Sequence, residues 1–403
     1  MEGWINKTVG EICKLRNGRA YKKSELLSSG KYPVLRVGNF FTNDHWYYSD
    51  LELDETKYCD NDALLYAWSA SFGPQIWTGS KVIFHYHIWR VDFDETQILK
   101  KFLYYWLSWD AERIKNDQGT GTTMLHVSMK SMNTRKISFP SLLEQERIVS
   151  ILDESFAAID TAIANTEKNL VNAQELFEVH LNAIVSQPAD DWVRKPLAVL
   201  CDPNRIITYG VIKLGKEVSD GVPCLRTSNV RWLHIETDDM KRISQSLSAQ
   251  YSRTILTGGE VLVNVRGTLG GVVVVGQDMA GWNVSREVAV VPVDPNLVKP
   301  EFISYIIASS TSQEWLSGVK KGAAYIGINL EDLRKLPVNV PDLGKQLEIV
   351  QQLSLLQKES ERLKFVSQRK LEALTELKQS ILHQAFTGQL TNTPTEALKA
   401  AGL

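Results

Sequence analysis

The sequence has little of what marks several large classes of protein. It holds only four cysteines in 403 residues, and none of them forms a CxxC pair: Cys13, Cys59, Cys201 and Cys224. Neither a disulfide framework nor a structural zinc site is expected, and a reducing cytoplasm fits this cysteine usage best. No apolar stretch reaches the roughly 18 uninterrupted residues of a membrane span. The first four residues lack the charged-then-apolar pattern of a secretory signal.

An excess of positive charge is also missing. The 45 Lys and Arg residues are outnumbered by 47 Asp and Glu residues, which gives a formal net charge of −2. A protein that coats nucleic acid non-specifically needs many cations for its phosphate contacts. A mixed-charge chain of this kind still accommodates local basic surfaces. Bulk charge therefore leaves the partner open.

Motifs of catalysis and of nucleotide or metal binding are absent as well. No Walker sequence, GxGxxG, HExxH, GxSxG or Asp/Asn-Pro-Pro-aromatic motif occurs. Gly267–Gly271 lies between two strand-like runs, which favours a tight hairpin. His85 and His87 would share one face of a strand, but no nearby acid or cysteine completes a metal site. We interpret them as part of an aromatic strand, and we predict no catalytic residue, no metal ligand and no cofactor in this chain.

What the sequence does contain is a long internal repeat. The segment Pro140–Val149 aligns with Pro341–Val350 at a shift of 201 positions, and helical positions further on keep the same shift. Upstream, Pro33–Arg36 followed by Asn39 matches Pro223–Arg226 followed by Asn229 at a shift of 190. Because these matches are collinear across both halves, we predict a tandem duplication.

Each half begins with a segment of short β-branched runs separated by Gly, Asn, Asp and Pro, the pattern of strands and turns. The runs are Val82–Phe84, Ile88–Val91, Val261–Val265, Val272–Val275 and Val288–Val291. A short helix is expected after each set, around Ile98–Arg113 and Pro300–Trp315. Two β-rich modules are therefore predicted.

After Pro140 and Pro341 the apolar spacing changes to alternating steps of four and three, the pattern of a heptad helix. The apolar stripe of the first helix, its seam, includes Ile148, Leu152, Phe156, Ile159, Ile163, Leu170 and Phe177. The second includes Ile349, Leu353, Leu356, Leu363, Leu374, Leu377 and Ile381. A helix of about 40 residues is about 60 Å long and must bury such a narrow apolar stripe. Its duplicate in antiparallel orientation is the expected partner; packing on its own module, or dimerisation of the chain, are the alternatives.

The predicted fold is thus α+β, with two β-rich domains separated by two long helices that form an antiparallel coiled coil of pseudo-twofold symmetry. The expected divisions are residues 1–142, first domain; 143–187, first helix; 188–343, second domain; 344–390, second helix; and 391–403, a flexible tail.

Three matching points in the two domains carry side chains suited to recognition. Arg can bind guanine bidentately and Asn can do so for adenine, while Gly-rich loops with hydroxyls or lysines suit close approach to phosphates. In the first domain the candidates for DNA contact are Arg36 and Asn39 at the first point, Trp68, Ser69 and Ser71 at the second, and Thr120 and Thr122 at the third. In the second domain they are Arg226, Ser228, Asn229 and Arg231 at the first point, Arg266 and Thr268 at the second, and Lys320, Lys321 and Tyr325 at the third. The alternatives are an Arg and Asn that tie down a loop at the first point, and plain solvated turns at the other two.

The chain resembles the specificity subunits of type I restriction–modification systems over nearly its whole length. The most specific motifs are the paired Phe139-Pro-x-Leu-x-x-Gln145-x-x-Ile-Val149 and Val340-Pro-x-Leu-x-x-Gln346-x-x-Ile-Val350. A late stretch, Leu377–Leu390, adds to them; the first helix departs there, since Leu181–Ser186 lacks the terminal Phe-x-Gly.

The resemblance implies a non-catalytic cytoplasmic subunit whose two target-recognition domains each bind one half of a split site in double-stranded DNA. It also implies docking of two adenine-methyltransferase subunits that use S-adenosylmethionine, with a motor-nuclease subunit that uses ATP and Mg where restriction is present. A methylation-only system is equally compatible with this chain. The other alternative is a coiled-coil scaffold that binds protein or carbohydrate through its β-rich modules.

Overall fold

The computed structural model describes residues 3–41, 44–69, 73–118, 126–186, 189–319 and 327–390. The chain divides into two compact units. Unit 1 comprises Met1–Thr166 with Arg369–Leu403, and unit 2 comprises Glu167–Gln368. The predicted tail, residues 391–403, lies outside the described residues.

The described residues of unit 1 form three small sheets. Strand β1 (Ile5–Thr8) pairs antiparallel with β10 (Lys136–Phe139). The other two run in the orders β2 (Cys13–Asn17)-β9 (Ile88–Phe93)-β6 (Leu64–Ala67)-β7 (Gly73–Ile76) and β4 (Tyr47–Ser49)-β3 (Tyr32–Leu35)-β8 (Val82–Phe84)-β5 (Tyr58–Cys59). Its shorter helices are α1 (Val9–Ile12), α2 (Val37–Phe41), α3 (Lys100–Gln118) and α4 (Met129–Asn133).

Unit 2 repeats this plan with shorter strands. Strand β11 (Val193–Pro196) pairs with β21 (Pro337–Val340), as β1 does with β10. The larger sheets are β12 (Thr208–Tyr209)-β20 (Val288–Val291)-β17 (Val261–Asn264)-β18 (Val272–Val274) and β16 (Lys241–Ile243)-β13 (Val222–Leu225)-β19 (Asn283–Val284), with β14 (Val230–Arg231) paired to β15 (His234–Ile235). The shorter helices are α6 (Gln245–Gln250), α7 (Pro300–Ala308), α8 (Ser310–Gly318) and α9 (Leu330–Arg334).

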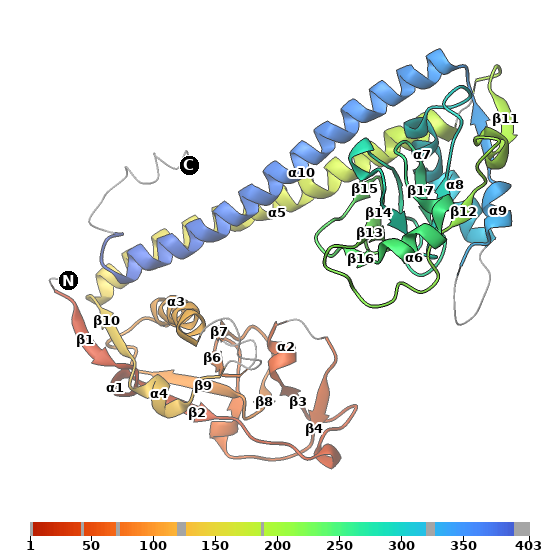
Figure 1. The fold of residues 1–403 in the computed structure, drawn as a ribbon. Helices are drawn as coiled ribbons and strands as arrows, with labels where there is room; N and C mark the ends of the chain where they lie inside the picture. Colours follow the sequence, from red (N-terminus) through yellow and green to blue (C-terminus); the bar gives the residue numbers. More distant parts are fainter. Residues whose placement is uncertain are drawn as a thin grey trace. The chain divides into compact units, whose positions relative to one another are not determined.

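The duplication predicted from the sequence is confirmed by these topologies. In both units a four-stranded antiparallel sheet lies beside a sheet with one parallel pair, β3 with β8 and β13 with β19. Helix α3 packs against β7, and α7 packs against β18 (Figure 1). The short helices predicted around Ile98–Arg113 and Pro300–Trp315 are present, but the second is broken at Ser309, whose hydroxyl caps α8 by accepting from the amide of Ser312.

One prediction is wrong. His85, Tyr86 and His87 do not continue a strand, because β8 ends at Phe84 and β9 begins at Ile88. The backbone turns between them, and the amide of Ile88 donates to the carbonyl of His85 across the turn. The two histidines therefore do not share one face of a strand.

Two long helices, α5 (Leu142–Ser186) and α10 (Leu343–Phe386), follow the two modules (Figure 1). In unit 2 the hydroxyl of Ser360 donates to the carbonyl of Ala173 at 2.7 Å. In unit 1 Lys378 pairs with Asp160 at 2.9 Å. Since the partner's number rises as that of the α5 residue falls, the two helices are antiparallel, as predicted.

The seam residues contact both the other long helix and the modules. Packing of a long helix on its own module, one of the alternatives considered from the sequence, therefore also occurs in part. In unit 1 Leu152 joins a core cluster with Phe102 of α3 and Phe386 of α10, and the two phenylalanine rings lie 5.3 Å apart. In unit 2 Phe177 and Leu353 belong to the cluster that contains α7. The seam is interrupted at Leu363, which is 37% exposed.

A buried glutamine fixes the start of each long helix. Gln145 is completely buried; its side-chain oxygen accepts from the amide of Leu99 at 2.8 Å, and its Nε2 donates to the carbonyls of Gln97 and Pro140, both at 2.9 Å. One side chain therefore satisfies three backbone groups, among them the buried carbonyl of Pro140.

The second glutamine repeats this arrangement. Gln346 is also completely buried, accepts from the amide of Lys299 at 2.8 Å, and donates to the carbonyls of Leu297 and Pro341 at 3.2 and 2.9 Å. The shared Pro-x-Leu-x-x-Gln motif thus joins each long helix to the loop that precedes α3 or α7.

Gln145→Leu is expected to destabilise the helix start of unit 1 by about 2 kcal/mol, because it leaves three backbone groups without partners, among them the buried carbonyl of Pro140. Hydrogen exchange should accelerate at the amide of Leu99 and leave that of Lys299 unchanged, while Gln346→Leu gives the reverse pattern. The exposed Gln174 of α5 supplies a control as Gln174→Leu. Unchanged exchange at Leu99 in the first variant contradicts the role assigned to Gln145.

Candidate nucleic-acid interface

The first candidate point of unit 1 lies at the end of β3. Arg36 is exposed, and its guanidinium carbon stands 5.4 Å from the centre of the Tyr47 ring, a cation–π contact. Asn39, in α2, is half-buried and donates to the carbonyl of His45 at 2.8 Å. Arg36 is thus placed to reach a ligand, while Asn39 also stabilises its own loop.

The equivalent residues of unit 2 are more strongly tied to the protein. Arg226 is half-buried and donates to the carbonyl and the carboxylate of Asp239 at 2.7 and 2.8 Å. Asn229 is only 1% exposed; it accepts from the amide of Arg226 and donates to the carbonyls of Glu236 and Asp239. These contacts favour the alternative in which Arg and Asn tie down a loop. Their neighbours Ser228 and Arg231 are exposed.

In unit 1 the second candidate point pairs with the segment that follows the third. Ser69 forms a β-bridge with His126, and the amide of Val127 donates to the carbonyl of Trp68 at 3.1 Å. Trp68 is half-buried, and its indole nitrogen donates to the carbonyl of Tyr86 at 2.7 Å. Backbone pairing therefore brings the segment that follows residues 119–125 against the second point.

The same backbone pairing, of the second point with the segment that follows the third, occurs in unit 2. Arg266 forms a β-bridge with Gly327, and the amide of Ile328 donates to the carbonyl of Val265 at 2.8 Å. Arg266 is half-buried, with its guanidinium carbon 5.7 Å from the centre of the Tyr209 ring; Thr268 is exposed. Six predicted residues lie outside the described residues: Ser71, Thr120, Thr122, Lys320, Lys321 and Tyr325.

Asn264 was not selected from the sequence, although it holds two of these points together. It is 1% exposed, and its side-chain nitrogen donates to the carbonyls of Val230 and Thr268 at 2.9 and 3.0 Å and more weakly to that of Thr227 at 3.4 Å. The signal was a lone amide within the apolar run Val261–Val265. A buried polar side chain in such a run needs partners, and the nearby loops supply them.

The aromatic cluster of unit 1 contains a histidine with a shifted pKa. Burial, followed by the neighbouring His87 and Arg36, lowers the pKa of His85 to about 4. His85 is therefore neutral at neutral pH and presents one hydrogen-bond donor and one acceptor. The rings of Tyr86 and His87 lie 3.9 Å apart, and Trp68 lies 5.0 Å from His87.

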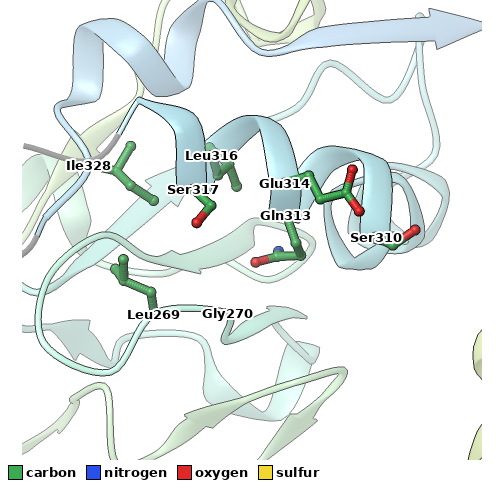
Figure 2. A pocket seen from close by; sticks show the side chains of 8 residues that line it. All are labelled: Leu269, Gly270, Ser310, Gln313, Glu314, Leu316, Ser317 and Ile328. Carbon is green, nitrogen blue, oxygen red and sulfur yellow. The ribbon is translucent and has the colours of Figure 1, made fainter.

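A pocket of about 400 Å³ is lined in part by Leu269 and Gly270 of the loop that carries the second point of unit 2 (Figure 2). Figure 2 shows Leu269 and Gly270 on one side and helix α8, with Gln313 and Glu314, on the other. Glu314 is the one ionisable residue in its lining, so the pocket does not bring together an acid and a base.

Burial raises the pKa of all four cysteine thiols to about 12, and none of the four is in a disulfide. The described residues contain no group of three or more His, Cys, Asp or Glu that could hold a metal ion. None of the helices within the described ranges combines the length and apolar character needed to cross a membrane.

Comparison with known proteins identifies the family. The model of the type I restriction modification DNA specificity domain matches residues 1–173 and 218–372. The Escherichia coli type I restriction enzyme EcoBI specificity subunit is 24% identical, over 97% of this chain and 87% of its own length. The MjaVIII specificity subunit of Methanocaldococcus jannaschii is 22% identical, over 96% and 93%.

Two solved structures share the fold. A chain from a study of complex assembly and conformational transition of the type I R-M system has a TM-score of 0.75 at 17% identity, covering 97% of this chain and 99% of that one. The HsdS subunit of Thermoanaerobacter tengcongensis has a TM-score of 0.54 at 16% identity, covering 97% and 98%. Since the family model matches most of both halves, this chain belongs to the family of type I restriction–modification specificity subunits.

Proposed function

We propose that this chain recognises a two-part DNA sequence, one part with each unit, and serves as the non-catalytic specificity subunit of a methyltransferase complex. One observation carries this proposal. The candidate points occupy matching backbone positions in the two units, whereas the side chains at those positions differ. Ser69 stands, on the same kind of β-bridge, where the other unit has Arg266, and Trp68 stands where it has Val265. A shared framework with different hydrogen-bonding groups suits two different half-sites.

The chemistry of the exposed side chains is that of major-groove recognition. Arg36 in unit 1 and Arg231 in unit 2 lie on the surface, and a guanidinium can donate two hydrogen bonds to the O6 and N7 atoms of guanine. Thr268, also exposed, can contact either a base edge or a phosphate. The modest net charge of −2 fits a protein that selects a sequence rather than one that coats DNA.

The long helices supply surfaces for partner subunits. Several large apolar side chains on them face solvent within unit 2: Val171 (55% exposed), Val179 (63%), Leu355 (71%) and Phe365 (68%). Large apolar side chains exposed on a helix are available for an interface with a partner protein. We assign this surface to adenine-methyltransferase subunits, two for each chain, which use S-adenosylmethionine; a motor-nuclease subunit that uses ATP and Mg joins where the system also restricts.

The direct test is to map methyladenine in DNA from cells that express this chain with its methyltransferase. A split motif methylated on both strands is expected. In the Arg36→Ala variant one base pair of one half-site should lose about ten- to a hundredfold of its selectivity, because a bidentate contact is lost. Methylation without any motif, or none in the presence of a bound methyltransferase, contradicts the proposal and favours a scaffold.

The helices are expected to set the length of the unspecified gap. Seven residues inserted between Thr166 and Glu167, with seven more between Gln368 and Arg369, keep the heptad spacing at the boundary of the two units. The insertion lengthens each helix by about 10 Å, so the gap should grow by about three base pairs. Methyladenine mapping reads the gap directly, with insertion of seven residues in the linker at Ala189 as the control. An unchanged gap refutes the ruler role.

Phe365→Glu is expected to weaken methyltransferase binding about tenfold or more, since a buried phenylalanine side chain contributes about 1.5–3 kcal/mol to an interface. Titration calorimetry with the purified methyltransferase measures the change. Lys358→Glu, at an exposed position of the same helix, adds negative charge without removing apolar surface. Equal affinity of both variants and the unmodified chain excludes Phe365 from the interface.

A further inference from the structure

A three-residue turn joins β8 to β9 in unit 1, and backbone hydrogen bonds fasten it to three other segments. The bonds run from His85 N to Leu35 O at 2.9 Å, from Tyr86 N to Arg19 O at 3.1 Å, and from Trp68 N to His87 O at 3.0 Å. The turn is thereby held between the end of β3, which leads to Arg36, and the Trp68–Ser69 segment.

The turn between β19 and β20 in unit 2 is fastened in the same way. Its bonds run from Ser285 N to Leu225 O at 2.8 Å, from Arg286 N to Val211 O at 2.9 Å, and from Val265 N and Arg266 N to Glu287 O at 2.9 and 3.3 Å. It therefore lies between the loop that begins at Arg226 and the segment that carries Arg266.

A glycine permits the close approach of backbones in both units. A Cβ atom on Gly18 would lie 2.3 Å from the carbonyl oxygens of Phe84 and His85. One on Gly210 would lie 1.8 Å from the carbonyl oxygen of Val284. Contacts this short with backbone atoms are not tolerated, so each turn requires glycine beneath it. The backbone conformation of each turn is thus fixed by hydrogen bonds to its main chain and by the glycine beneath it, and it does not depend on the side chains of the turn residues.

The side chains differ completely between the two turns. Unit 1 presents His85, Tyr86 and His87, a neutral aromatic set in which Tyr86 is 38% exposed. Unit 2 presents Ser285, Arg286 and Glu287, of which Ser285 is buried and donates from its hydroxyl to the Glu287 carboxylate at 3.3 Å. Arg286 and Glu287 are half-buried.

We propose that these two turns are specificity-determining elements, each contacting base edges of one half-site. This inference rests on the proposed function and names residues of the same interface that neither the sequence motifs nor the family match assigns. The donors of Arg286 suit the O6 and N7 atoms of guanine, and the carboxylate of Glu287 accepts from the amino group of cytosine. The turn of unit 2 therefore selects a G·C pair. The exposed ring of Tyr86 offers an apolar face and a hydroxyl, which selects a thymine-containing pair in the other half-site.

The test uses the full chain bound to its methyltransferase and a DNA library randomised at one half-site at a time. Arg286→Ala is expected to reduce discrimination at one G·C pair about ten- to a hundredfold and to leave the other half-site unchanged. Tyr86→Ala is expected to relax one position of the opposite half-site. Arg286→Lys, which keeps the charge, should also lose discrimination, because a lysine cannot bind guanine through a rigid fork.

Arg253→Ala is the matched control, since Arg253 is exposed in unit 2 but lies outside the turn. Hydrogen exchange at the amides of Val265 and Ile328 reports whether the framework survives. Unaltered selectivity in all turn variants overturns the assignment. So does an equal loss of binding to every sequence, which a phosphate contact would produce. If the unmodified complex selects no split motif, the proposed function itself fails, and the two failures are therefore distinguishable.

Discussion

The structure depends on one buried amide at the start of each long helix. Gln145 and Gln346 each accept one hydrogen bond and donate two, and all their partners are backbone groups. A carboxylate in that place would lack the donors, and an apolar side chain would leave the carbonyls unsatisfied. The amide therefore fixes both where the helix begins and which of its faces meets the module.

The apolar seam can be shared between a module and a second helix only because that face is fixed. Near its amino end α5 buries Leu152 in the core of unit 1, and near its carboxyl end it buries Phe177 in the core of unit 2. Between these positions the seam becomes polar, and Ser360 replaces a large apolar side chain with a hydrogen bond to the α5 backbone. A small hydroxyl allows close approach of the two helices at this position.

The duplicated plan could be predicted because the glutamine motif recurs at a shift of 201 residues and a heptad spacing follows it in both halves. The function of the glutamine could not, since two of the three partners of Gln145 lie 46 and 48 positions away in sequence. The turn at His85–His87 was misassigned because apolar runs flank it on both sides, and alternation alone does not reveal a chain reversal. Arg226 and Asn229 matched a recognition pattern, but their loop contacts depend on Asp239 and Glu236, which no pattern connects to them.

The division between constant backbone and variable side chain would allow one framework to serve the two half-sites that we propose. At the turn in each unit, the turn contributes main-chain atoms to the bonds that fasten it to other segments, and in unit 1 one of these, the carbonyl of Tyr86, also accepts from the Trp68 indole. The glycine beneath the turn is needed whatever the turn residues are. Side chains such as Tyr86 and Arg286 can therefore change without removing a bond that stabilises the fold. Asn264 is the opposite case: its side chain itself holds the loops of unit 2, so a substitution there alters the framework before it alters specificity.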